Sequence, residues 1–305
     1  MRKNLIKALI FILPSFVIIA AFRIFPLIFS FLVSLHDWGI EGPKDFKGFE
    51  NFVFLFKDIE FWRSLLNTFY YVMGVVPVQL ILGLFFAVFL SSRIKGRTFF
   101  RTIYYIPIVT SIVAIAVVWK WILNPYRGFA NYILSFLSIP PLKWLEEPKS
   151  ILAILFSKKL PGPSFALFSL MLLGIWQHTG FNIIIYLAGL ENIPKTYYDA
   201  AKIDGAGPVK QFFSITLPLL GPTTFYLLIV NTIGSYNIFA PIWIMTSPPG
   251  GPLGTTRTVM YYFYQQSFEF WNLGYGSAVA IVSFALIVLL TIFQRKVVEK
   301  KVFYG

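Results

Sequence analysis

Cysteine is absent from this chain of 305 residues, and its two histidines stand far apart at His36 and His178. A chain without thiols has no disulfide, no cysteine nucleophile and no cysteine-ligated zinc or iron–sulfur centre. Two isolated histidines do not make a histidine-rich metal site. The composition therefore predicts that the chain binds no metal of its own.

Charged residues are also scarce. They make up 13% of the chain, whereas 57% of the residues are hydrophobic and the mean hydropathy is +0.72. This balance excludes an ordinary water-soluble globule. The net charge of +13 does not indicate nucleic-acid binding, because the basic residues lie between apolar runs and form no stripe or arm.

The apolar runs are long enough to cross the roughly 30 Å core of a bilayer. We predict an all-α integral membrane protein with about six transmembrane helices. These predicted spans are 8–35, 65–91, 99–122, 165–190, 217–245 and 272–294. The first run continues too far beyond its basic start to be a cleaved signal peptide. We divide the chain into an N-terminal helix with its external loop (1–64) and a core transmembrane domain (65–300).

None of the 13 Asp and Glu residues falls inside a predicted span. Ion-gradient-driven carriers usually keep a carboxylate at membrane depth, where it relays protons or binds the coupling ion. A membrane-embedded enzyme would need an acid–base pair, which is lacking too. We therefore expect a transport subunit that is not an enzyme, and an ion-gradient-driven secondary transporter or channel for a small solute is the alternative.

The basic residues indicate the orientation. Lys and Arg outnumber acids by 14 to 4 in the connecting segments on the side of the termini, and by only 11 to 9 in the opposite set. Cytoplasmic loops carry the excess of Lys and Arg. We therefore expect both termini in the cytoplasm, with 140–164 in the longest external segment. The terminal set comprises 1–7, 92–101, 191–216 and 294–305.

The segment 191–218, called here the 191–218 loop, has the pattern of two short helices. Pro194 suits a first helical turn, Gly205 can take the left-handed conformation that stops a helix, and Pro208 can open the next one. Tyr197 lies on a face that two small alanines keep shallow. Such a helix could dock into a partner's groove or lie on the bilayer surface.

The 191–218 loop also carries a spaced motif. Asp-Ala-Ala is followed after three residues by Gly, and after nine more residues by Ile-x-Leu-Pro. The motif positions are Asp199, Ala200, Ala201, Gly205, Ile215, Leu217 and Pro218, with Asp204 and Ala206 on either side of the glycine. In this register the chain resembles the permease subunits of binding-protein-dependent ATP-binding-cassette importers, of the maltose-type carbohydrate family. The family has Glu where this chain has Asp199, and its extended form includes Asp204 and Ala206.

The resemblance implies a type I importer permease fold in the bacterial cytoplasmic membrane. It implies that the 191–218 loop, with Tyr197 and Tyr198 as anchors, couples transport to a cytoplasmic ATPase. The chain has no Gly-Lys pair and hence no phosphate-binding Walker loop, so ATP and Mg would be bound by partner subunits. The implied partners are a second permease subunit, two ATPase subunits and an external sugar-binding protein.

Uncharged polar residues near the middle of two predicted spans form the candidate substrate pathway. Amides and hydroxyls beside aromatic rings suit a sugar or polyol, which needs hydrogen bonds and stacking but no counter-charge. Polar residues in membrane helices also join helices by hydrogen bonds, so this alternative stays open. The candidates are Trp176, Gln177, His178, Asn182, Asn231, Ser235, Tyr236 and Asn237.

Overall fold

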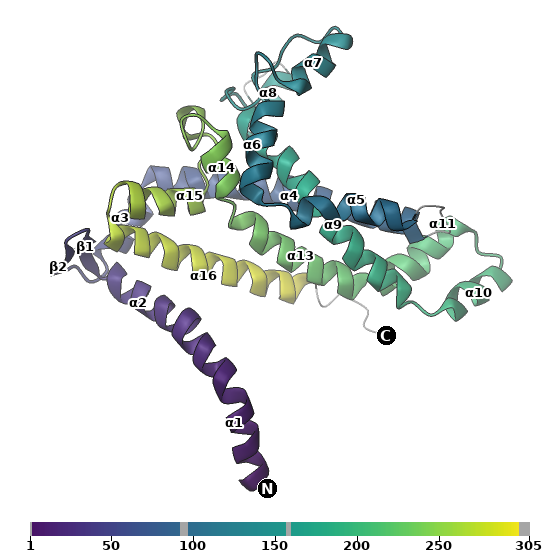
Figure 1. The fold of residues 1–305 in the computed structure, drawn as a ribbon, viewed down its shortest axis with the longest axis horizontal. Helices are drawn as coiled ribbons and strands as arrows, with labels where there is room; N and C mark the ends of the chain where they lie inside the picture. The colour runs from purple at the N-terminus through teal and green to yellow at the C-terminus, as the bar shows by residue number, and fades with distance from the viewer. Residues whose placement is uncertain (1, 92–96, 157–159, 299–305) are drawn as a thin grey trace. The chain divides into compact units, whose positions relative to one another are not determined.

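A computed structural model describes residues 2–91, 97–156 and 160–298 (Figure 1). Part of the basic 92–101 segment and the last seven residues lie outside these ranges. Within these ranges, four helices are long and apolar enough to cross a membrane: Phe11–Ser34, Ile59–Ser91, Phe165–Glu191 and Leu273–Val297.

Two further pairs of helices pass the same test but are bent. The angle is 105° between Thr102–Val109 and Ile112–Ile122, and 61° between Pro208–Leu219 and Gly221–Tyr236. Counted as one span each, they bring the total in the described ranges to six, as the sequence predicts.

The chain divides into two compact units, Met1–Trp62 with Tyr262–Leu286, and Arg63–Tyr261 with Ile287–Gly305. The boundary predicted at residue 64 falls beside the first of these divisions, but residues 262–286 join the first unit. The first unit contains α1 (Arg2–Ile19), the π-helical turn η1 (Ala20–Ile24), α2 (Phe25–Ser34), β1 (His36–Gly39), β2 (Gly42–Phe46), α3 (Glu50–Lys57) and the π-helical turn η4 (Gln265–Glu269).

A short antiparallel hairpin and α3 close the end of α2 in the first unit. The strands pair Trp38 with Pro43 and Gly39 with Gly42. Asn51 on α3 donates its Nδ2 to the carbonyls of Ser34, at 2.8 Å, and His36, at 3.0 Å. This single amide therefore ties α3 to the last turn of α2 and to the first residue of β1.

A cluster of one carboxylate and two tyrosines lies where α3 ends. Asp58 accepts hydrogen bonds from the phenols of Tyr262 and Tyr275, and from the backbone amide of Glu60 at 2.9 Å. Burial acts to raise the pKa of Asp58, but these hydrogen bonds to the charged form outweigh it, so the pKa lies below its ordinary value. The cluster thus holds an ionised carboxylate at the start of a membrane-spanning helix.

The second unit contains most of α4 and a longer run of elements. They are α4 (Ile59–Ser91), α5 (Arg97–Val109), α6 (Ile112–Ile122), α7 (Phe129–Phe136), α8 (Ile151–Phe156), α9 (Phe165–Glu191), α10 (Lys195–Ile203), α11 (Pro208–Gln211), η2 (Phe212–Thr216), α12 (Leu217–Leu219), α13 (Gly221–Tyr236), α14 (Ala240–Met245) and η3 (Pro252–Gly254). Like α4, the helices α15 (Val259–Tyr264) and α16 (Leu273–Val298) have residues in both units.

The core of the second unit joins α4, α9 and α13. Its buried members are Ala87, Leu90, Ile183, Tyr186, Leu187, Ile193, Leu220 and Leu227. On the α5 side of α9, a Cβ at Gly180 would lie 1.9 Å from the carbonyl oxygen of Tyr104. Only a residue without a side chain allows this backbone approach, so Gly180 fixes how closely α5 packs on α9.

The third predicted span does not run straight. α5 ends at Val109, and α6 leaves it at a steep angle with α7 and α8 beyond it (Figure 1). α6 instead packs along α14, where Lys120 donates its Nζ to the carbonyl of Ile244 at 2.9 Å. Hydropathy predicts one continuous span here, because both halves are apolar.

Candidate functional site

The first half of the 191–218 loop folds as α10, and its end is fixed by backbone hydrogen bonds. Pro194 is the N-cap, and Gly205 follows the helix with φ +74°. The amide of Gly205 donates to the carbonyl of Lys202 at 3.0 Å, and that of Ala206 to Ala201 at 2.8 Å. These two bonds define a Schellman motif, which depends on the left-handed residue at its centre.

The 191–218 loop is tied to the core of the second unit. The hydroxyls of Tyr198 and Thr216 lie 2.9 Å apart, and Thr216 is buried. Tyr198 and Ile215 both pack against the core shared by α4, α9 and α13. Gln211 donates its Nε2 to the carbonyl of Ala206 at 2.7 Å, which joins the two short helices. A force on α10 therefore reaches the core through side-chain contacts.

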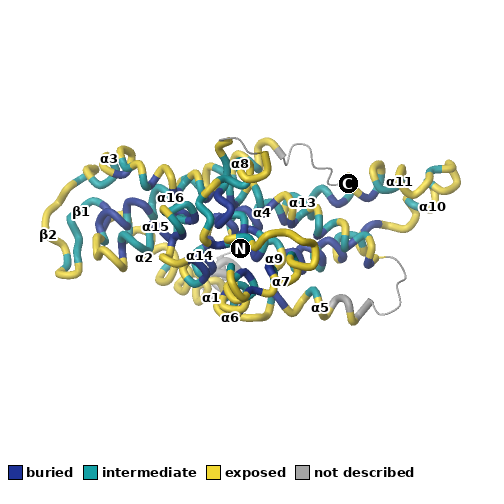
Figure 2. Tube along the Cα trace, turned by 90° about the horizontal axis from the view of Figure 1, so that it is seen from above, coloured by how far each residue is buried: buried dark blue, intermediate teal, exposed yellow. Residues whose placement is uncertain are grey.

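The outer face of α10 is open. The helix has no buried residue, and Figure 2 shows it largely exposed. Tyr197 is 53% exposed, and Ala200 beside it leaves the surface shallow. Asp199, which replaces the family's Glu, forms an exposed ion pair with Lys202 at 3.1 Å. Asp204 is the C-cap of α10. Leu217 and Pro218 are exposed at the start of α12.

A cavity of about 370 Å³ lies in the second unit and is called here the Gln177 cavity. Gln177 is in the middle of α9, roughly 20 Å from either end at the α-helical rise. α4 contributes Tyr71 and Gln79 to the wall, and α9 also contributes His178. The volume falls in the usual range for small-molecule sites, about 300–1,000 Å³.

Two breaks in helices meet at the Gln177 cavity. α6 begins there with Ile112, directly after its bend from α5. Residues 234, 235 and 237–241 line the cavity where α13 gives way to α14. Non-helical backbone at membrane depth is tolerated where it lines a cavity, and transporter sites often form at such broken helices. The geometry therefore marks this cavity as a candidate substrate site.

The structure separates the candidate pathway residues into two groups. Gln177, Ser235 and Asn237 line the Gln177 cavity. Asn182 and Asn231 do not: Asn231 donates its Nδ2 to Oδ1 of Asn182 at 2.8 Å, and both residues are buried. This pair joins α9 to α13 by a hydrogen bond, so Asn182 and Asn231 serve to join helices and do not line the cavity.

The two aromatic candidates also lie outside the cavity wall. Trp176 is 46% exposed and packs against Trp119, with ring centroids 5.7 Å apart, while Tyr236 is buried. Sequence reasoning missed Tyr71 and Gln79 in the wall. Gln79 is an amide in the middle of a long apolar run, and this pattern is a signal by which the sequence could have identified it.

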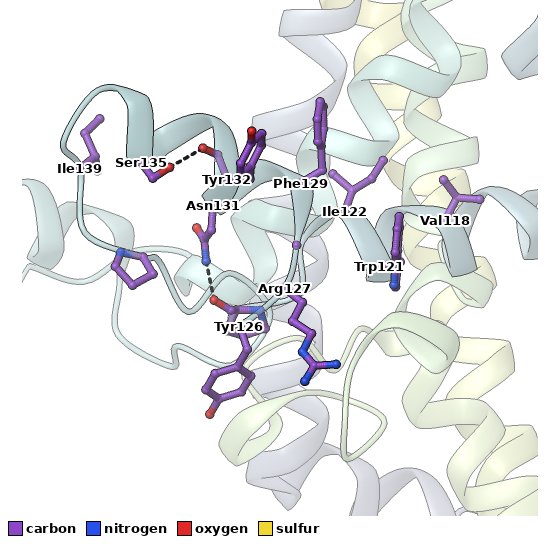
Figure 3. Close-up of a pocket in the computed structure, with 13 residues that line it drawn as sticks. Val118, Trp121, Ile122, Tyr126, Arg127, Phe129, Asn131, Tyr132, Ser135 and Ile139 are labelled. Carbon is purple, nitrogen blue, oxygen red and sulfur yellow. Dashed lines mark hydrogen bonds between the residues drawn. The ribbon is translucent and has the colours of Figure 1, made fainter.

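A larger hollow of about 850 Å³ lies between α6 and α7 (Figure 3). Its wall comes from one continuous stretch of chain, and two of its polar side chains bond to residues in or next to that stretch. Asn131 donates to the carbonyls of Pro125 and Leu142 and accepts from the indole of Trp144 at 2.8 Å. Ser135 bonds back to the carbonyl of Tyr132. These contacts fold the segment, so the hollow is the weaker candidate for a solute site.

Comparison with known proteins settles the family. Residues 60–304 match the binding-protein-dependent transport system inner membrane component. The chain belongs to this family. It is a multi-pass permease subunit of the cytoplasmic membrane, and the permease is similar to relatives over almost its whole length.

Several relatives are more than 30% identical to the permease, among them one from Bacillus subtilis and one from Thermococcus litoralis. The probable ABC transporter permease protein YesP of Bacillus subtilis is 35% identical over 97% of this chain and 91% of its own. The trehalose/maltose transport system permease protein MalF of Thermococcus litoralis is 36% identical over 94% of this chain and 91% of its own. The resemblance seen in the 191–218 loop is thereby confirmed at the level of family.

The fold of the permease is confirmed by a solved structure. A bacterial alginate ABC transporter, crystallised with an alginate pentasaccharide-bound periplasmic protein, contains a chain that superposes with a TM-score of 0.80. The alignment covers 97% of the permease and 94% of that chain at 23% identity. The permease therefore has the type I importer fold that the resemblance implies.

Proposed function

We propose that this permease subunit imports a sugar or polyol by alternating access, with ATP hydrolysed by separate subunits. The observation that carries the proposal is the 191–218 loop, whose family motif lies on an exposed helix tied to the transmembrane core. A bilayer-surface role fits α10 less well. Interfacial helices bury Trp, Phe or Leu, and α10 has none of them.

The partner assembly follows from this docking face. Two ATPase subunits bind ATP and Mg, a second permease subunit completes the membrane pathway, and an external sugar-binding protein delivers the solute. The permease itself needs no cofactor. When the ATPase pair closes on ATP, α10 moves with it, and contacts from Tyr198 and Ile215 pass the displacement to α4, α9 and α13.

The substrate class is supported by the chemistry of the Gln177 cavity. Among the described residues that line it there is no Asp, Glu, Lys or Arg, while amide and hydroxyl groups are present. An anionic solute would favour a cationic side chain, whereas a neutral polyhydroxyl solute needs donors and acceptors. The trehalose/maltose name of one relative agrees with a neutral sugar.

Reconstitution of the whole complex tests the proposal. The permease pair, the ATPase subunits and the binding protein are assembled in proteoliposomes, and ATP hydrolysis and uptake are measured with a panel that includes maltose, trehalose and glycerol 3-phosphate. We expect one neutral sugar-loaded binding protein to stimulate both activities. Uptake driven by an ion gradient without ATP would contradict the proposal.

A further inference from the structure

Gln79 is a buried amide on α4 that is only half satisfied. The residue is 1% exposed, and its Nε2 donates to the carbonyl oxygen of Gly174 on α9 at 2.9 Å. Its Oε1 has no hydrogen-bond partner in the described part of the chain. Buried polar atoms without a partner are rare in folded proteins, so such an atom calls for an explanation.

The orientation of the Gln79 amide is set by its surroundings. A reversed amide would place Oε1 against the carbonyl oxygen of Gly174, where two acceptors would repel each other. Nδ1 of His178 also lies 3.2 Å from that carbonyl oxygen, so the oxygen has a second polar neighbour on α9 itself. The bond from Nε2 therefore leaves Oε1 as a fixed acceptor without a donor.

The location of Gln79 indicates what the donor is. Gln79 lines the Gln177 cavity, as do polar residues of α9 and of the end of α13. We propose that Oε1 of Gln79 accepts a hydrogen bond from a hydroxyl group of the transported solute, which makes Gln79 a specificity-determining residue on α4. This inference rests on the proposed function, since it requires a polyhydroxyl solute to pass through this cavity.

A second glutamine in the chain provides a matched control. Gln294 on α16 also donates its Nε2 across helices, to Oγ1 of Thr232 at 2.9 Å, and its Oε1 also lacks a partner among the described residues. It does not line the Gln177 cavity. Replacing each glutamine by methionine removes a similar tie between helices, but only one replacement changes the cavity wall.

The test measures discrimination between sugars in the reconstituted complex. Maltose, trehalose and their singly deoxygenated analogues are supplied on saturated binding protein. Under saturation, the affinity of the binding protein for each sugar does not affect the measured translocation rate. In the native complex we expect loss of one particular hydroxyl to slow transport about two- to tenfold, the value of one hydrogen bond. Gln79→Met should abolish that ratio, whereas Gln294→Met should keep it.

The outcomes separate the two proposals. An unchanged ratio in Gln79→Met, or a native complex indifferent to every hydroxyl, overturns the role of Gln79 alone. If the native complex carries neither sugar nor any other polyol, the proposed function fails and the role of Gln79 fails with it. If Gln79→Met does not assemble, Gln79→Asn, whose acceptor is one methylene shorter, must lower the same ratio, and an unchanged ratio overturns the inference.

Discussion

Two glycines in the 191–218 loop allow a sharp test of how α10 is held. Neither Gly205 nor Gly207 has any atom within 4 Å of the position that a Cβ would take. They differ in backbone conformation, since φ is +74° at Gly205 and −68° at Gly207. Substitution by alanine therefore adds no clash at either site and strains the backbone only at Gly205.

The size of the effect follows from this difference. A left-handed conformation costs a residue with a Cβ about 1–2 kcal/mol. Gly205→Ala should thus lower the equilibrium constant for the Schellman-terminated loop roughly five- to thirtyfold. Gly205→Asn should cost less, because Asn tolerates this region better. Gly207→Ala should be nearly neutral, since an extended residue before proline accepts alanine.

The assay measures binding of the ATPase subunits to the permease pair, and then uptake in proteoliposomes. Gly205→Ala should weaken ATPase binding by up to the same factor and lower uptake with it, because only the structured loop presents α10 for docking. Native binding and uptake in Gly205→Ala would show that the left-handed residue does not hold α10 in place. Equal losses in Gly205→Ala and Gly207→Ala would show that the backbone conformation at Gly205 is not the cause.

Three further predictions concern stability, measured as the thermal midpoint of the purified protein in detergent. Asp58→Asn should be destabilised above about pH 4, and its deficit should vanish at lower pH, because a carboxylate with a depressed pKa stabilises only while ionised; a pH-independent deficit would contradict this. Asn231→Leu should lower the stability by about 1 kcal/mol, because the buried Oδ1 of Asn182 loses its donor. Replacing both Asn182 and Asn231 by leucine should recover part of this loss of stability. Losses that simply add in the double variant would count against pairing. Gly180→Ala should cost about 1–3 kcal/mol by forcing α5 off α9, with Gly207→Ala as the control; equal midpoints for the two variants would disprove the close approach.

Much of the fold was predictable because its signals are local. Span positions follow from the length of apolar runs, and the end of α10 follows from Gly205 and Pro208, whose backbone preferences do not depend on distant contacts. The bend between α5 and α6 was not predictable. Both halves are apolar, and α6 is held by long-range contacts to α14, such as the bond from Lys120 to Ile244.

The candidate site was predictable only in part. Polarity identified the middle of α9, but α9 is buried on several sides and has no single polar stripe. Sequence alone therefore could not say that Gln177 points into a cavity while Asn182 points at α13. That choice depends on how three helices pack, as does the contribution of Gln79 from α4.

Docking of an ATPase subunit on α10 is the contact on which the proposed coupling depends. Because the chain has no cysteine, Ala200→Cys provides a single attachment point for a benzophenone maleimide on the exposed face. In the assembled complex, illumination should cross-link this position to the ATPase subunit, and a probe at Tyr126, on the predicted external segment, should not react with it. A probe at residue 200 that labels only lipid or the external binding protein would contradict docking of the ATPase subunit on α10.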